Sequence, residues 1–110
     1  MQTAGENMYS LSFYVPVEYA EQVKEALFAA GAGRQGDYDK CSWQTLGQGQ
    51  FRPLAGSSPF IGVQGALEYV DEYKVEMICA EENIVAAVAA LKAAHPYEEP
   101  AYSVIKIEVV

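Results

Sequence analysis

The single histidine of this chain opens a segment whose side chains could coordinate a cation. His95 is followed closely by Glu98 and Glu99 in the sequence HPYEEP, and the two prolines of this segment restrict its backbone. An imidazole nitrogen with one or two carboxylates is a donor set that divalent transition metals accept in proteins. These three side chains are therefore candidate ligands of a divalent metal ion, and no other cofactor is predicted.

His95 also has a structural interpretation, which its position in the sequence favours. It continues the apolar stripe of an expected helix and falls in its last turn, where the helix dipole and a carbonyl partner both suit an imidazole. One histidine per chain is few for a tight metal site, so a complete site would need groups from several subunits. A small metal-dependent hydrolase that uses His95 with Glu98 or Glu99 is kept as the alternative to a non-enzymatic domain.

A glycine-rich stretch, GAGRQG at residues 31–36, raises the question of nucleotide binding. Its spacing matches G-x-G-x-x-G, the loop that wraps a dinucleotide pyrophosphate, but that loop must leave a strand and open a helix. In this chain the stretch follows an expected helix, whose carbonyl end favours cations. We therefore interpret it as a glycine helix cap and turn.

Side chains near this turn, and near a second glycine-rich stretch, could bind a small ligand. The candidates are Arg34, Tyr38, Cys41, Ser42 and Arg52. An arginine assisted by glycine N–H groups can pair a small anion, although each arginine could equally bind carbonyls or carboxylates of its own chain. Cys41 could act as a nucleophile if the fold placed it beside His95, but a buried cysteine is more often a small apolar filler. Cys79 lies in an alternating apolar run and is predicted to be in the core.

Hydrophobic periodicity predicts the elements that would position these groups. Alternating residues predict strands, and apolar residues at helical spacing predict helices ended by Gly31 and Pro96. The strands are expected at residues 8–15, 68–80 and 102–110, and the helices at residues 18–30 and 81–95.

The stretch between the first helix and the second long strand is more irregular. Residues 41–54 are predicted to form a hairpin that turns at Gly47, Gln48 and Gly49. Residues 55–66, rich in glycine, are predicted to form a long ordered loop held by Phe60 and Ile61. Residues 1–7 are expected to be a loose terminus.

This order of elements predicts one α+β domain over residues 1–110. The expected fold is a ferredoxin-like β-α-β-β-α-β sandwich with an extra hairpin and a long loop, in which two helices cover one face of an antiparallel sheet. The other face is expected to carry Trp43 and several tyrosines. An uncovered apolar face on a small domain is usually covered by a partner, often a copy of itself.

The charge and the cysteine content of the sequence limit which classes of partner and which cellular compartment we expect. The formal net charge is −8, with six acids and four bases in residues 1–67 (−2) and nine acids and three bases in residues 68–110 (−6). Such a surface repels phosphate, which argues against nucleic acid and against anionic membranes. Two cysteines without a secretion signal favour a reduced, cytoplasmic protein.

Three stretches in sequence order, GAGRQGDYDKCSW, GQGQFRPLAGSSPFIG and HPYEEPAY, closely resemble the insert domain of the Nif-three-like (YqfO-type) proteins. The resemblance implies a domain related in shape to CutA and PII proteins, which assemble as homo-oligomers, more often trimers than dimers. Full-length members carry a two-metal site on flanking domains that this sequence does not contain. The resemblance therefore does not extend their hydrolase label to this chain.

Together these observations predict an oligomeric domain that binds a small ligand or a metal, or regulates a protein partner. The sequence favours a binding domain over an enzyme because it contains no complete catalytic constellation. A third interpretation is a purely structural part of a larger assembly. The identity of the ligand does not follow from the sequence.

Overall fold

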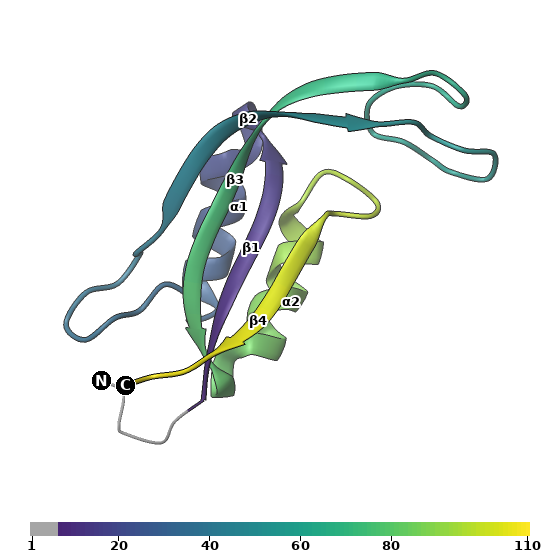
Figure 1. Cartoon of the computed structure of the whole chain (residues 1–110). Helices are drawn as coiled ribbons and strands as arrows, with labels where there is room; N and C mark the ends of the chain where they lie inside the picture. Colours follow the sequence, from purple (N-terminus) through teal and green to yellow (C-terminus); the bar gives the residue numbers. More distant parts are fainter. Residues whose placement is uncertain (1–6) are drawn as a thin grey trace.

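The computed structural model describes residues 7–110 and contains a four-stranded antiparallel sheet with two α-helices on one face (Figure 1). The spatial order of the strands is β2-β3-β1-β4. The elements along the chain are β1 (Met8–Pro16), a 3-10 turn (Val17–Tyr19), α1 (Ala20–Ala29), β2 (Trp43–Phe51), β3 (Glu68–Ala80), α2 (Glu81–Ala94) and β4 (Tyr102–Ile107). This confirms the predicted α+β, ferredoxin-like fold.

The core lies between the sheet and the helices, as the alternation and the helical spacing predict. On β1, Leu11 and Phe13 are completely buried, and they pair in register with Met77 and Val75 of β3. The helices contribute small and branched side chains to the same cluster, which allows close approach to the sheet. The buried helical residues are Ala20, Val23, Leu27, Ala87 and Leu91. Cys79 also lies in this core and is 1% exposed, as predicted.

The glycine-rich stretch ends α1 and does not open another helix. Gly31 has a φ of 103°, a left-handed conformation that suits glycine, and its N–H donates to the carbonyl of Phe28 at 3.0 Å. Gly33 then donates to the carbonyl of Ile78 at 2.8 Å, which ties the loop to the end of β3. The helix cap and turn predicted for residues 31–36 are therefore confirmed.

The predicted hairpin at residues 41–54 is wrong, because β2 runs without a turn through Gly47, Gln48 and Gly49. Gly47 pairs with Glu72 and Gly49 with Val70, and neither glycine has a positive φ. A Cβ atom at Gly49 would overlap the Glu72 carboxylate. Gly49 thus marks a close approach within a strand, a signal that sequence alone does not separate from a turn.

The hairpin that does form is β2–β3, and it projects from the rest of the sheet. β1 pairs with β3 only from Glu72 to Ala80, whereas residues 68–71 of β3 pair with β2 alone. We call residues 48–71 the arm; it extends beyond the helices in Figure 1 and gives the molecule extents of 49 × 24 × 22 Å. The predicted long loop at 55–66 lies at its tip, where the ring of Phe60 contacts that of Tyr19, with ring centroids 5.5 Å apart.

The face of the sheet away from the helices is less aromatic than predicted. Strand register places Trp43 and Tyr14 on this face, 70% and 39% exposed, whereas Tyr9, Tyr73 and Tyr102 lie on the helix side. The centre of the face is formed by small polar side chains such as Ser12. Strand register also places Met8, Ile78, Ile105 and Ile107 on this face as neighbours, because Met8 pairs with Ile107 and Ser10 pairs with both Ile78 and Ile105.

The ends of the described chain add two further facts. The loose terminus predicted at residues 1–7 lies outside the described residues except for Asn7, whose side-chain amide donates to the Glu81 carboxylate at 3.0 Å. Within residues 7–110, neither helix combines the length and the apolar character needed to cross a membrane.

Candidate functional site

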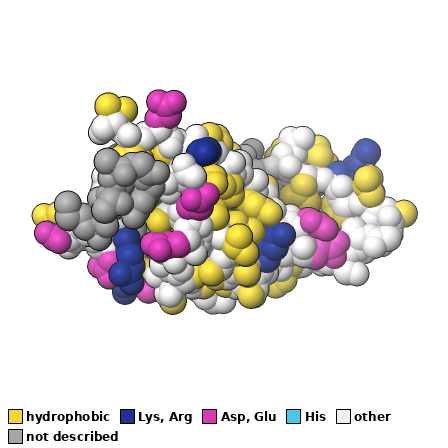
Figure 2. Space-filling view, turned by 90° about the horizontal axis from the view of Figure 1, so that it is seen from below, with side chains coloured by type: hydrophobic (Ala, Val, Ile, Leu, Met, Phe, Trp, Pro, Cys, Tyr) yellow, Lys and Arg dark blue, Asp and Glu magenta, His cyan; other side chains and the backbone are white. Residues whose placement is uncertain are grey.

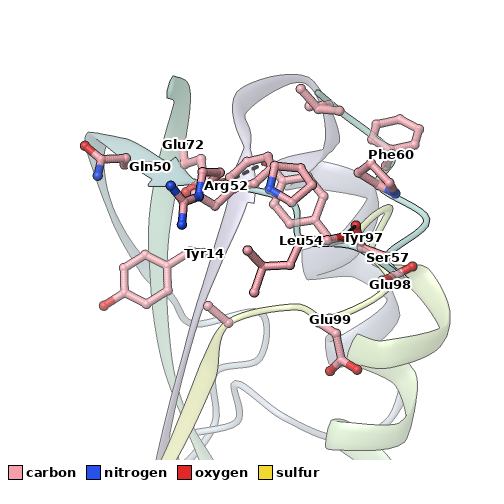
Figure 3. Close-up of a pocket in the computed structure, with 15 residues that line it drawn as sticks. Tyr14, Gln50, Arg52, Leu54, Ser57, Phe60, Glu72, Tyr97, Glu98 and Glu99 are labelled. Atoms are coloured by element: carbon pink, nitrogen blue, oxygen red, sulfur yellow. Dashed lines mark hydrogen bonds between the residues drawn. The ribbon is translucent and has the colours of Figure 1, made fainter. Parts of the chain in front are cut away.

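A cavity of about 440 Å³ lies where the base of the arm meets the segment between α2 and β4 (Figure 3). Its volume is in the range of small-molecule sites, about 300–1,000 Å³. The walls come from β1, the arm, β3 and the segment before β4. The lining residues are Tyr14, Gln50, Phe51, Arg52, Pro53, Leu54, Ser57, Pro59, Phe60, Ile61, Glu72, Tyr97, Glu98, Glu99 and Ala101.

His95 is next to this cavity, with its ring centroid 5.0 Å from that of the lining residue Tyr97, and it is hydrogen-bonded through both ring nitrogens. Nδ1 accepts the backbone N–H of Tyr97 at 3.1 Å, so Nε2 carries the proton and donates to the Tyr14 carbonyl at 2.7 Å. Burial lowers the pKa of His95, against the opposing effects of the Tyr14 carbonyl and the Glu72 charge. The ring is therefore neutral and joins the end of β1 to the segment before β4.

This arrangement leaves no free lone pair on His95 for a metal ion. The residues from 7 to 110 contain no group of three or more His, Cys, Asp or Glu side chains placed to hold one. Metal binding by His95, Glu98 and Glu99 would require the imidazole to leave its two hydrogen bonds, and it stays a prediction.

Tyr97 connects the same segment to the arm through a buried carboxylate. Its hydroxyl donates to Oε2 of Glu72 at 2.9 Å, and Glu72 is only 9% exposed. Burial, together with the hydrogen bond to Glu72 and its charge, raises the pKa of Tyr97, so the phenol keeps its proton at neutral pH. Gly49 provides the space in which the Glu72 carboxylate lies.

The two neighbouring glutamates have different surroundings. The Glu98 carboxylate accepts the backbone N–H of Ser58, at 3.0 Å to Oε2 and 3.3 Å to Oε1, which holds the arm loop against the segment before β4. Glu99 forms no ion pair or side-chain hydrogen bond with residues 7–110. Both line the cavity on the side opposite to Arg52 in Figure 3.

The structure divides the predicted ligand-binding residues between two ends of the molecule. Arg52 lines the cavity, whereas Arg34, Tyr38, Cys41 and Ser42 belong to the loop that precedes β2. β2 has nine residues, which places its two ends roughly 30 Å apart at the usual rise of a strand. The loop and the arm accordingly lie at opposite ends in Figure 1, and the structure does not bring Cys41 to His95 within one chain.

Sequence reasoning missed Glu72 and Tyr97, although both lie at the centre of the hydrogen-bond network. Tyr97 is inside the HPYEEP segment, but a tyrosine between a proline and two glutamates gives no periodic signal. Glu72 continues the polar side of an alternating strand, in phase with Lys74 and Glu76, so the pattern gives no signal of a special environment. Its proximity to Gly49 depends on strand register and could not be read from spacing.

The sheet order, the two helices on one face and the extended β2–β3 hairpin define a ferredoxin-like domain of the CutA type. The periplasmic divalent cation tolerance protein CutA of Archaeoglobus fulgidus matches with a TM-score of 0.66 and 19% identity, over 94% of this chain and 86% of that one. CutA1 of Ehrlichia chaffeensis matches with a TM-score of 0.69 and 14% identity, over 97% and 87%. At such identities the likeness shows the fold alone.

Sequence similarity adds relatives that match this domain over part of their length. The chain is 49% identical over 100 residues to a GTP cyclohydrolase 1 type 2 homolog of Halalkalibacterium halodurans (91% of this chain, 27% of the relative) and 42% identical over 106 residues to that of Bacillus subtilis (96% and 28%). A Bacillus cereus protein related to NIF3 matches with a TM-score of 0.82 and 37% identity, over 99% of this chain and 28% of that one. The chain is homologous to one region of these longer proteins, which confirms the predicted resemblance to the Nif-three-like (YqfO-type) proteins.

The match concerns one region of much longer proteins. The chain spans about a quarter of the length of the curated relatives it matches. No family model matches the chain. The words "GTP cyclohydrolase 1 type 2 homolog" therefore describe those relatives and assign no reaction to the residues described above.

Proposed function

We propose that this chain is a self-associating binding domain whose arm is covered by other copies and whose cavity holds a small ligand. The observation that carries the proposal is the apolar character of the arm. Several of its large side chains are about half exposed or more in the single chain: Leu54, Phe60, Val63, Leu67 and Tyr69. A projecting hairpin with this composition is unfavourable in water and is usually covered by a protein surface.

The body of the single chain offers a second apolar surface, separate from the arm. In the view of Figure 2, hydrophobic side chains gather in the middle of the molecule, and acidic and basic side chains are interspersed around them. Such an apolar centre with a charged rim is typical of protein–protein interfaces. The resemblance to CutA and PII domains favours a trimer over a dimer as the assembled form.

The cavity supports the ligand-binding part of the proposal. It is fixed by hydrogen bonds from two directions, Tyr97 to Glu72 and Ser58 to Glu98, so its walls are held in place before a ligand arrives. Preorganisation of this kind lowers the entropic cost of binding. Binding or regulation explains these features without requiring a catalytic step.

Light scattering after size-exclusion chromatography tests the assembly. We expect a mass of about three times the 12.0 kDa of one chain. Val63→Glu and Leu67→Glu should reduce this mass, because a charge would have to be buried in the interface. Val85→Glu is the matched control, since Val85 is 81% exposed on α2 and far from the arm in sequence. A wild-type protein that stays at the mass of one chain at micromolar concentration would refute the proposal.

A further inference from the structure

We propose that the cavity at the base of the arm binds an organic cation, specifically an ammonium group attached to an apolar body. This inference rests on the proposed function, in which the cavity is a ligand site, and adds the chemical class of the ligand. It depends on three observations: the aromatic walls, a buried carboxylate with an unused oxygen, and the balance of charge around the cavity.

Aromatic rings form much of the cavity wall. Tyr14, Phe51, Phe60 and Tyr97 all line it, and the rings of Phe51 and Tyr97 contact each other with centroids 5.7 Å apart. The faces of such rings carry partial negative charge and attract ammonium groups, and clustered rings are a common means of recognising them. Leu54 and Ile61 complete an apolar surface that suits the body of the ligand.

Glu72 supplies a buried negative charge that its own chain satisfies only in part. Its Oε2 accepts the Tyr97 hydroxyl, whereas Oε1 accepts no hydrogen bond from residues 7–110. The Glu72 side chain is 9% exposed and Oε1 is not a fully buried atom, so this oxygen is open to a partner from the cavity side while few water molecules surround the carboxylate. A cationic ligand in the cavity would provide the missing partner.

The charges around the cavity favour a cation over an anion. Glu72, Glu98 and Glu99 line it with Arg52 as the single base, and the chain as a whole carries −8. Arg52 is exposed and forms no ion pair with residues 7–110, and Figure 3 places it on the side away from Glu98 and Glu99. Excess negative charge in a partly enclosed site attracts cationic ligands and repels anionic ones.

The experiment uses three probes of similar size and different charge: 2-phenylethylammonium, 2-phenylethanol and 3-phenylpropionate. Each is titrated into the full chain in its native assembly, with affinity from calorimetry and location from amide chemical shifts. We expect the ammonium compound to bind about 10-fold more tightly than the alcohol, and the carboxylate to bind most weakly. The shifted amides should belong to the cavity residues.

Three variants test the charges directly. Glu72→Gln keeps an acceptor for the Tyr97 hydroxyl but removes the charge, and should weaken ammonium binding about 10-fold. Glu76→Gln is the matched control, because it makes the same change on the same strand outside the cavity. It should change the affinity for the ammonium compound by no more than about 2-fold. Arg52→Gln should strengthen ammonium binding by about 3-fold. If Glu72→Gln does not fold, Arg52→Gln decides between the two charges of ligand. Stronger ammonium binding in this variant supports the cation assignment, and weaker or unchanged ammonium binding overturns it.

The outcomes separate this inference from the proposed function. Equal binding of the alcohol and the ammonium compound, or tightest binding of the carboxylate with loss in Arg52→Gln, would overturn the cation assignment and leave a ligand site in place. No shift of cavity amides with any probe would overturn the cation assignment and the ligand site together. Self-association is judged separately by light scattering.

Discussion

His95 shows how one residue type supports two chemical interpretations that only its hydrogen bonds separate. Its ring donates to Tyr14 and accepts from Tyr97, and burial lowers its pKa. A neutral imidazole used at both nitrogens connects two parts of the backbone, which is the structural interpretation that its place at the end of a helix favours. Protonation would give Nδ1 a hydrogen that faces the Tyr97 N–H, so the charged ring does not fit this site.

The lowered pKa of His95 predicts a pH dependence of stability. Because the folded state has the lower pKa, the unfolded state binds more protons as the pH falls below about 6.5, the ordinary value for histidine. We therefore expect the free energy of unfolding in urea to be largest above this pH and to decrease from pH 7.5 to pH 5.5. In His95→Gln, which keeps a donor toward Tyr14, this decrease should be smaller. An equal decrease in both proteins would show that other groups are responsible.

At the scale of elements, the arm is positioned by a small number of contacts around Glu72. β2 and β3 leave the sheet as a hairpin, and the segment before β4 supports its base through Tyr97 and Glu98. Gly49 belongs to this support because the absence of a side chain allows the carboxylate to lie across β2. The three motifs GAGRQGDYDKCSW, GQGQFRPLAGSSPFIG and HPYEEPAY thus connect elements of the fold. The second and third of them meet at the cavity.

Two glycines of β2 provide a matched test of this role. Gly49→Ala should destabilise the fold by about 1–3 kcal/mol, because the new Cβ atom would overlap the Glu72 carboxylate. Gly47→Ala meets no atom within 4 Å and should be neutral or stabilising by about 0.5 kcal/mol. Chemical denaturation of both variants measures the difference. The double variant Gly49→Ala with Glu72→Ala should lose most of the strain, and equal stability of the two single variants would contradict this account.

At the scale of the whole molecule, the apolar arm favours assembly, whereas the net negative charge opposes it. The long arm exposes apolar side chains that association would bury, whereas each chain contributes a formal charge of −8. Bringing several such chains together costs electrostatic free energy that dissolved salt reduces. The assembly is therefore expected to depend on ionic strength even though its contacts are mainly apolar.

This balance predicts stronger association at higher salt. Lowering sodium chloride from 0.15 M to 0.01 M at neutral pH should shift the protein toward smaller species, because the screening length rises from about 8 Å to about 30 Å. Light scattering at a series of concentrations measures the shift. An assembly that weakens when salt is added would indicate that ion pairs hold it together, contrary to the apolar arm proposed above.

The sequence by itself determined β1, β3, β4, the two helices and the class of fold, but not β2. Alternation in β1 and β3, helical spacing in α1 and α2 and the glycine at the end of α1 are local patterns, and each depends on residues that are close in the chain. The same patterns, together with three motifs, were sufficient to predict the ferredoxin-like arrangement and the NIF3/YqfO relationship.

Only the tertiary structure decided which candidate residues lie together. Arg52, Glu98 and Glu99 meet at the cavity, whereas Arg34 and Cys41 lie at the other end of β2, and Glu72 entered the site without a recognisable signal. The prediction of a turn at Gly49 is wrong because the group that requires a glycine there, the carboxylate of Glu72, belongs to a residue 23 positions away in the sequence. Strand register and the packing of distant segments determine such contacts, and neither can be read from local spacing.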